Sequence, residues 1–216
     1  KPAGLLIHGV AGKSVELSLA DWLLKNYPEV RSVGDDPASR PGIIHRLDKD
    51  TSGVIIIARN QETFDYLKSL FQNHQIQKTY LALVCGKMAD KNGVINKPIG
   101  IKTGSLKRSV HSDKMKKEAI TEYEIVKHYT LNAKPYTLLN VMPKTGRTHQ
   151  IRVHLASIGY PIVGDKLYGG KRKAPLELKR QFLHAKTIEF TLPSGERMKF
   201  EAELPEDLKS LLKLNQ

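Results

Sequence analysis

Cysteine is almost absent from this 216-residue sequence, which contains Cys85 alone. A single thiol forms no internal disulfide and builds no cysteine-rich zinc module, so a secreted, disulfide-stapled scaffold is excluded. Long apolar runs are missing too, because stretches such as Val54 to Ala58 fall far short of the ~18 residues that a membrane helix needs. We therefore expect a soluble protein of a reducing compartment, the cytoplasm, with no membrane partner.

Acidic residues are in short supply: 22 Asp and Glu stand against 35 Lys and Arg, for a formal net charge of +13. This balance favours a polyanionic partner through phosphate contacts, although a merely soluble basic protein explains the charge equally well. Aromatic residues are only 6% of the chain, which argues against a binder of single strands that works by stacking alone. Pairs of His or Cys with zinc-site spacing are also missing, so we expect no metal.

The remaining composition is that of an ordinary globular protein, with 40% apolar and 26% charged residues. A chain of this length makes one full-sized domain and buries about 70% of its unfolded surface. Helical and strand patterns alternate without a regular βαβ rhythm and without an internal repeat. A single mixed-sheet domain over residues 1–216, α/β or α+β, is the simplest expectation.

Hydrophobic periodicity predicts the main elements. Helices are expected at Ser14 to Asn26, at Asn60 to Asn73 behind an Asn cap, and after Pro205 with Leu208, Leu211 and Leu212 facing inward. Strands are expected at Gly53 to Ala58, fully buried, at Thr79 to Val84, and in two hairpins that pair Ala119 to Tyr129 with Tyr136 to Met142 and Thr187 to Leu192 with Met198 to Leu204. The segment at about 87–118 is rich in Lys and Arg and lacks periodicity, so it is interpreted as a basic surface insertion.

The sharpest local feature is HRLDKDTSG, His45 to Gly53, a polar cluster between Ile43-Ile44 and the apolar run. Burying such a cluster is costly without a purpose. Neighbouring Arg46 and Lys49 would keep Asp48 ionised, and an ionised carboxylate can act as a nucleophile or a base. A turn explains the residues equally well, with side chains satisfying backbone donors ahead of the strand: Asp48, Asp50, Thr51 and Ser52.

A second feature is TGRTHQIRVHLASIG, Thr145 to Gly159. Thr148 can cap a helix that carries an apolar stripe, with His149 and Arg152 together on the opposite face. With Arg147 close by, that helix start would hold a phosphate or the carboxylate of Asp48. A solvated helical face is the plainer alternative. The apolar stripe consists of Ile151, Leu155 and Ile158.

Taken together, these segments resemble the RluA family of RNA pseudouridine synthases. The resemblance rests on five ordered pieces: Lys1-Pro2-Ala3-Gly4 with Ile7-His8, HRLDKDTSG, Lys78 to Val84 (KTYLALV), TGRTHQIRVHL running into Gly164-Asp165 and Tyr168-Gly169, and Phe182 to Ala185 (FLHA). They span nearly the whole chain. The resemblance implies an α+β pseudouridine synthase fold, a central mixed and mostly antiparallel sheet flanked by helices and loops.

The same resemblance implies roles for individual residues. Asp48 would be the essential aspartate, Tyr80 the aromatic residue that stacks on the target base, and Arg152 the partner that forms a salt bridge with Asp48. Arg46 would enter the RNA where the base leaves the stack, and Ile151 would line the uracil pocket. Further substrate contacts are expected from His45, Arg147, His149 and Leu183.

The implied reaction converts uridine to pseudouridine in structured ribosomal or transfer RNA. It breaks a C1′–N1 bond and forms a C1′–C5 bond, which needs a carboxylate near the sugar but no redox change, metal or cofactor. Asp48 would attack C1′ or remove a sugar proton, and sequence does not choose between these routes. A glycosidase would need a second carboxylate, and Asp50 is badly placed for that task. A catalytically silent RNA-binding module is the other alternative.

RNA capture is the point where this chain departs from many relatives. Those carry a small N-terminal RNA-binding domain of the S4 type, whereas this sequence starts almost at the first catalytic motif. We therefore expect the catalytic domain itself, or residues outside this sequence, to bind the RNA. In the basic segment, Lys107, Arg108, Lys116 and Lys117 are expected to hold the RNA backbone. No feature demands more than a monomer.

Overall fold

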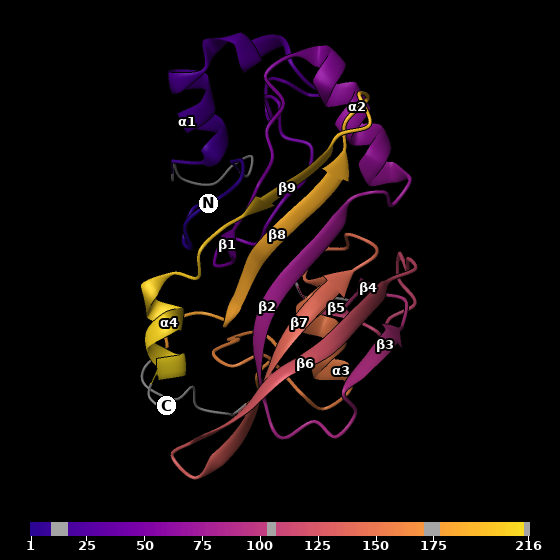
Figure 1. The fold of residues 1–216 in the computed structure, drawn as a ribbon. Coiled ribbons are helices and arrows are strands. Elements are labelled where there is room, and N and C mark those ends of the chain that lie inside the picture. The colour runs from indigo at the N-terminus through magenta and orange to yellow at the C-terminus, as the bar shows by residue number, and fades with distance from the viewer. Residues whose placement is uncertain (10–16, 103–106, 171–177, 214–216) are drawn as a thin grey trace.

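A seven-stranded sheet runs through the middle of the structure, a computed structural model that describes residues 1–9, 17–102, 107–170 and 178–213 (Figure 1). Its strand order is β1-β8-β2-β7-β6-β3, with β9 pairing β8 as well. These strands are β1 (Ser52–Gly53), β2 (Gln77–Cys85), β3 (Asn92–Asn96), β6 (Ile120–Leu131), β7 (Lys134–Pro143), β8 (Leu183–Thr191) and β9 (Arg197–Glu201). β1 and β8 are parallel and the other pairs are antiparallel, so the expected mixed, mostly antiparallel sheet is confirmed.

Helices cover the sheet at several places (Figure 1). They are α1 (Leu19–Asn26), the 3-10 turn η1 (Pro28–Ser32), α2 (Gln61–Gln72), α3 (Gln150–Ser157) and α4 (Glu206–Lys213). The predicted Asn60 cap is confirmed, because its side chain accepts a hydrogen bond from the Thr63 amide at 2.8 Å. α1 begins later than expected, behind a capping box of Ser18 and Asp21. The expected cap Ser14 lies outside the described residues.

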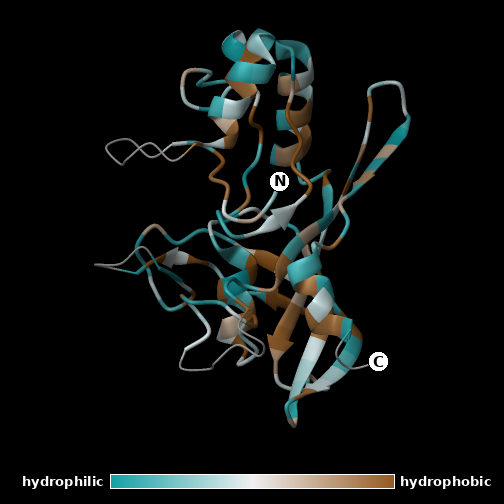
Figure 2. Ribbon diagram, turned by 90° about the vertical axis from the view of Figure 1, so that its left-hand side faces the viewer, coloured by the Kyte–Doolittle hydropathy of each residue, from teal (hydrophilic) through white to brown (hydrophobic). Residues whose placement is uncertain are grey.

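The core lies between the sheet and the helices α3 and α4. Leu83 and Leu139 from the central strands are fully buried together with Leu155 of α3 and Leu208 of α4. Figure 2 shows the same arrangement, with hydrophobic residues gathered in the central strands and both hydrophobic and hydrophilic residues on the helices. The inward positions predicted for the last helix are confirmed for Leu208 and Leu211, whereas Leu212 is only partly buried.

The apolar run Val54–Ala58 differs from the expected buried strand. Only Ser52–Gly53 pairs with β8, and the following residues are extended with a single bridge from Ile57 to Ile43. Alternate side chains pack into two separate clusters, Ile55 and Ile57 on the α1 side and Val54 and Ile56 on the α2 side. The expected full burial is also wrong, because Val54 to Ile57 are only partly buried and Ala58 alone is buried. The run is apolar because each of its faces packs against one cluster, and it needs no strand ladder for that.

The described part of the basic segment at about 87–118 contains strands that the sequence pattern did not indicate. It supplies β3, which pairs with β6 in the main sheet, and the short ribbon of β4 (Gly100–Ile101) and β5 (Arg108–Ser109). Ile95 and Ile99 are buried. The segment is thus anchored in the core at its start and reaches the surface with its charged side chains. Within the described part of the chain, every helix is too short or too polar to cross a bilayer.

Gly53 lies in β1, just after the polar loop of residues 43–51 that carries Asp48. The backbone geometry at Gly53 admits no other residue. Its φ is +126°, and a Cβ atom there would lie 2.1 Å from the carbonyl oxygen of Ala185. We expect Gly53→Ala to lower the free energy of unfolding by about 2–4 kcal/mol, measured by urea denaturation. Gly195→Ala is the control, because φ is +86° there but nothing lies within 4 Å, so only the strain of about 1 kcal/mol applies. Equal costs for the two variants would contradict this account.

Candidate active site

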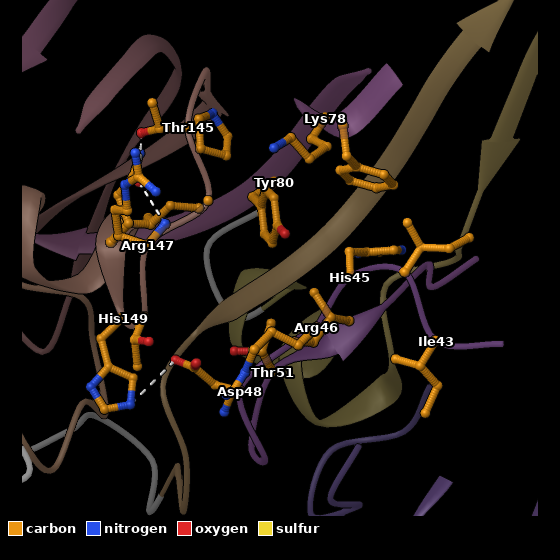
Figure 3. A pocket seen from close by; sticks show the side chains of 18 of the residues that line it. Ile43, His45, Arg46, Asp48, Thr51, Lys78, Tyr80, Thr145, Arg147 and His149 are labelled. Carbon is orange, nitrogen blue, oxygen red and sulfur yellow. Dashed lines mark hydrogen bonds and ion pairs between the residues drawn. The ribbon is translucent and has the colours of Figure 1, made fainter. Parts of the chain in front are cut away.

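A pocket of about 600 Å³ opens where the polar loop 43–51 meets β2, the start of α3 and the start of β8 (Figure 3). It brings together segments that are far apart in the sequence. Nine of the residues expected from the sequence to act on or bind a substrate line this pocket: His45, Arg46, Asp48, Tyr80, Arg147, His149, Ile151, Arg152 and Leu183. The four basic residues expected to contact the RNA backbone are not among its lining residues.

The polar loop forms its turn with backbone atoms, which leaves the side chain of Asp48 for another use. The amide of Thr51 donates to the carbonyl oxygen of Asp48 at 3.0 Å. The Thr51 and Ser52 hydroxyls meet the side chains of Gln181 and His184 instead of local backbone donors. The carboxylate of Asp48 points into the pocket, with its side chain 18% exposed. The loop therefore contains a turn made by backbone atoms and, separately, a carboxylate that faces the pocket.

Arg152 lies between two carboxylates. Its Nη1 donates to Asp48 Oδ2 at 2.9 Å, so the salt bridge expected from the sequence is confirmed. On its other side, Nε and Nη2 donate to the two oxygens of Asp165 at 2.7 and 2.9 Å. The Arg152 side chain is only 6% exposed, which excludes the alternative of a solvated helical face. The fork geometry holds the guanidinium plane rigidly and aims one N–H at Asp48.

The opposite charges of Arg152 and its carboxylate partners compensate for the cost of burying each charged group. Burial disfavours the cation of Arg152, but hydrogen bonds and charge from Asp165, together with the charge of Asp48, outweigh it and raise the pKa of Arg152. Burial also works against the anion of Asp165, yet the bonds from Arg152 and from the amides of Leu167 and Tyr168 lower the pKa of Asp165. Both groups therefore stay charged, and Asp48 faces a permanent positive charge.

Asp165 is a site residue that the sequence reasoning missed. It appeared only as a letter in the Gly164-Asp165 motif, with no role attached. Its side chain is fully buried, with 0% exposure, and a buried carboxylate requires a cation or several donors. Because the partner is Arg152 on α3, no local pattern around Asp165 could have indicated the pair.

Tyr80, Lys78 and His45 line the pocket on the side of β2 (Figure 3). Burial, reinforced by the charge of Asp48, raises the pKa of Tyr80 above its usual range, so its hydroxyl keeps its proton. Burial lowers the pKa of Lys78 to about 8, so its ammonium is still mostly charged at pH 7 but loses its proton more easily than an ordinary lysine. Lys78, which lines the pocket, is a second site residue to which sequence reasoning gave no role.

His45 has a supporting position in the wall of the pocket. Its Nε2 accepts a hydrogen bond from the amide of Ile56 at 2.9 Å, and its ring stacks on Phe71 with 4.8 Å between centroids. Burial, and then the charge of Lys78, lowers the pKa of His45 to about 3. The ring is thus neutral and is held in the wall of the pocket by these contacts.

The start of α3 differs from the expected Thr148 cap. The N-cap residue is His149, in the left-handed region with φ +57°, and its side chain makes no capping bond. Gln150 organises the turn instead, because its Oε1 accepts from the Arg147 amide at 2.9 Å and from the Thr145 hydroxyl at 2.7 Å. The left-handed residue turns the His149 ring towards Asp48, with 4.0 Å between Nε2 and Oδ2 (Figure 3).

The expected RNA-backbone residues lie outside the pocket. The backbone amide of Arg108 donates to the hydroxyl of Tyr168 at 2.9 Å, which ties β5 to the far side of the His149 ring. Lys116 forms an exposed ion pair with Asp113 at 3.0 Å. Among the residues that the structure describes, no group of three or more His, Cys, Asp or Glu side chains is arranged to hold a metal ion.

Comparison with known proteins identifies relatives of this chain. A family model described as RNA pseudouridylate synthase matches residues 1–157. A protein of Chloroflexus aurantiacus named as an uncharacterized RNA pseudouridine synthase is 41% identical, over 99% of this chain and 64% of its own length. The ribosomal large subunit pseudouridine synthase D of Nitrosomonas europaea is 40% identical, over 98% of this chain and 60% of its own length. This chain thus spans about three fifths of the length of these relatives.

Solved structures agree. A structure titled human RNA pseudouridylate synthase domain containing 4 superimposes with a TM-score of 0.75, at 25% identity, over 99% of this chain and 87% of that one. A second, titled human RNA pseudouridylate synthase domain containing 1, has a TM-score of 0.70 at 23% identity, over 96% and 88% of the two chains. The fold expected from the sequence resemblance is therefore confirmed.

The Asp165–Arg152 pair yields a stability prediction. Asp165→Asn removes the buried one of the two anions that pair with Arg152, so we expect the free energy of unfolding at pH 7 to fall by about 3–5 kcal/mol. Because the pKa of Asp165 is below its ordinary 3.8 in the folded protein, its contribution is complete above pH 3.8 and is lost as the pH falls further. Denaturation curves of the two proteins at pH 7 and below 3.8 measure this difference.

The control for this variant is Asp113→Asn, which breaks the exposed pair with Lys116, where the Asp113 side chain is 91% exposed. We expect a change below about 0.5 kcal/mol there. If Asp165→Asn costs no more than this control, or if its cost persists unchanged at low pH, Asp165 does not act as a buried anion.

Proposed function

Because the chain belongs to the RNA pseudouridine synthase family, we propose that it converts specific uridines in structured RNA to pseudouridine. The observation that carries this proposal is the ion pair between Asp48 and Arg152 inside the pocket. The hydrogen bond from Nη1 of Arg152 fixes the direction of the Asp48 carboxylate in the pocket. The relatives named for the ribosomal large subunit lead us to propose RNA of that subunit, in the cytoplasm, as the substrate.

The chemistry assigned to Asp48 follows from its surroundings. One oxygen, Oδ2, is held by Arg152, and the carboxylate is otherwise open to the pocket. In the reaction this carboxylate either attacks C1′, forming an ester that C5 of the uracil later displaces, or removes a sugar proton that is later returned. In both routes the C1′–N1 bond breaks, the C1′–C5 bond forms, the proton on C5 is lost and N1 takes up a proton. The pocket must hold the uracil during this step, which is the role we propose for Tyr80, Ile151 and Leu183. The protonated hydroxyl of Tyr80 is available to the base, on which its ring would stack.

The target nucleotide must leave its RNA stack to reach Asp48. Extrusion costs a few kcal/mol, which stacking in the pocket and contacts to the flanking phosphates would offset. A volume of about 600 Å³ is in the range of pockets that enclose small ligands. Arg46 lies beside Asp48 at the pocket and would fill the space that the base leaves (Figure 3).

Hydrolysis of the glycosidic bond fits the site less well. A glycosidase uses a second carboxylate to handle water or the leaving group. Asp165 is the other carboxylate on Arg152, but it is fully buried and both of its oxygens are occupied. Asp50 is not among the residues that line the pocket. The arrangement thus favours an isomerase, in which the freed base is retained.

Asp48→Asn tests this function. The amide keeps the size of the side chain but removes its charge, so we expect pseudouridine formation on large-subunit ribosomal RNA to fall by about 10³-fold or more, with RNA affinity largely kept. Pseudouridine is measured by mass spectrometry of the digested RNA. Asp50→Asn is the matched control and should keep normal activity. Normal rates for Asp48→Asn, or release of free uracil by the unaltered protein, would refute the proposal.

RNA capture by the basic segment is a separate part of the proposal. Its support is the charge of the segment, because four basic side chains on one stretch of chain suit contacts to phosphates. We expect the replacement of Lys107, Arg108, Lys116 and Lys117 by Gln to weaken RNA binding and to reduce the slope of log affinity against log salt by about one per lost contact. The control removes the same amount of charge elsewhere, by replacing four other lysines with Gln: Lys25, Lys199, Lys209 and Lys213. Equal effects of the two sets would show that only net charge matters.

A further inference from the structure

His149 lies between two polar groups, and its two ring nitrogens have different partners. Nε2 faces Oδ2 of Asp48 at 4.0 Å, and Nδ1 is 3.0 Å from the hydroxyl oxygen of Tyr168. A neutral imidazole carries one proton, so one nitrogen donates and the other accepts. Which nitrogen holds the proton decides whether Asp48 meets a donor or a lone pair.

The hydrogen bonds of Tyr168 determine the answer. Its oxygen accepts a hydrogen bond from the backbone amide of Arg108 at 2.9 Å. Burial raises the pKa of Tyr168, so the hydroxyl also has a proton to donate. The lone pair at Nδ1 of His149 is the acceptor within reach, and donation to it satisfies the partly buried phenol. The proton of the imidazole is therefore on Nε2, facing Asp48.

The other tautomer, which has its proton on Nδ1, is unfavourable at both ring nitrogens. It would place the lone pair of Nε2 against the carboxylate of Asp48 and leave the hydroxyl proton of Tyr168 without this acceptor. Burial lowers the pKa of His149, against the opposing charge of Asp48, and keeps the ring neutral near pH 7. The charged groups that act on it are Asp48, Arg152, Asp165 and Arg108.

Tyr168 is itself held firmly in place. Its amide donates to Oδ1 of Asp165 at 3.0 Å, and the guanidinium of Arg152 lies 5.2 Å from the centre of its ring. The His149 ring meets it edge to face at 5.7 Å. His149 in turn adopts a left-handed backbone, φ +57°, which costs about 1–2 kcal/mol in a residue other than glycine. The surrounding contacts hold that strained conformation and so aim the ring.

We propose that Tyr168 is a positioning residue that keeps His149 in the Nε2–H form, and that His149 uses this N–H as the second donor to the carboxylate of Asp48. The separation of 4.0 Å would close to a hydrogen bond when RNA fills the pocket. Asp48 is then held by Arg152 and His149 together during the reaction. The catalytic part of this inference rests on the proposed function, whereas the tautomer does not.

The tautomer is measured directly by ¹⁵N NMR of the imidazoles in the full chain at neutral pH, with His149 assigned by its absence in His149→Gln. We expect a protonated-type shift at Nε2 and an unprotonated-type shift at Nδ1. His45 is the internal reference, because its Nε2 accepts from the Ile56 amide and its proton must be on Nδ1. In Tyr168→Phe, the His149 shifts should move towards a mixture of both forms. A proton on Nδ1 in the unaltered protein, or no change in Tyr168→Phe, would overturn the inference.

Kinetics tests the role in catalysis. Tyr168→Phe keeps the ring but loses the hydroxyl, so we expect kcat for pseudouridine formation to fall about tenfold, as for one lost hydrogen bond, with KM for RNA unchanged. His149→Gln places an amide N–H near the position of Nε2 without any help from Tyr168. It should retain more activity than His149→Ala, and adding Tyr168→Phe to it should have no further effect.

The outcomes separate this inference from the proposed function. If Tyr168→Phe costs the same factor in the His149→Gln variant as in the unaltered protein, or if it changes KM instead of kcat, the positioning role is wrong. If the unaltered protein forms no pseudouridine on its RNA, the proposed function fails. The NMR measurement on the unaltered protein and on Tyr168→Phe still decides the tautomer in that case, because it needs no activity.

Discussion

The guanidinium of Arg152 links the two carboxylates of the site, Asp48 and Asp165. It is buried and satisfies a fully buried carboxylate, Asp165, on one side and the pocket carboxylate, Asp48, on the other. Asp48 and Arg152 are 104 residues apart in the chain, so their contact brings the N-terminal loop onto α3. Since Asp165 uses two of the donors and fixes the plane of the group, the remaining N–H has one direction in which to hold Asp48.

The fold supports this interaction from outside the pocket. The parallel pairing of β1 with β8 and the bond between Ser52 and His184 tie the end of the polar loop to the central sheet. On the other side, the side chain of Gln150 ties the start of α3 to β6 through Thr121 and Ile120. Two sides of the pocket are thus attached to two strands of one sheet, β8 and β6. The catalytic geometry we propose depends on that sheet more than on the loops themselves.

Local patterns predicted those elements in which local forces dominate. The α2 helix has a side-chain cap at Asn60 and an apolar stripe of its own, and the β6–β7 hairpin has matched strands around a tight turn, so both were predictable. Other predictions failed where tertiary contacts replaced local ones. Val54–Ala58 is apolar because it packs on two clusters, and α3 begins at His149 in a conformation that only its surroundings make stable.

The sequence by itself determined the family, the carboxylate at position 48 and the cation at position 152, because these belong to contiguous motifs whose chemistry can be recognised residue by residue. Only the tertiary structure decided that Asp165 anchors Arg152 and that Tyr168 contacts His149. Asp165 lies 13 positions after Arg152, and Tyr168 lies 19 positions after His149. No single helix or strand contains both members of either pair, so no regular spacing in the sequence indicates the contact. A hydrogen bond depends on direction and distance in space, and packing of the whole chain establishes both.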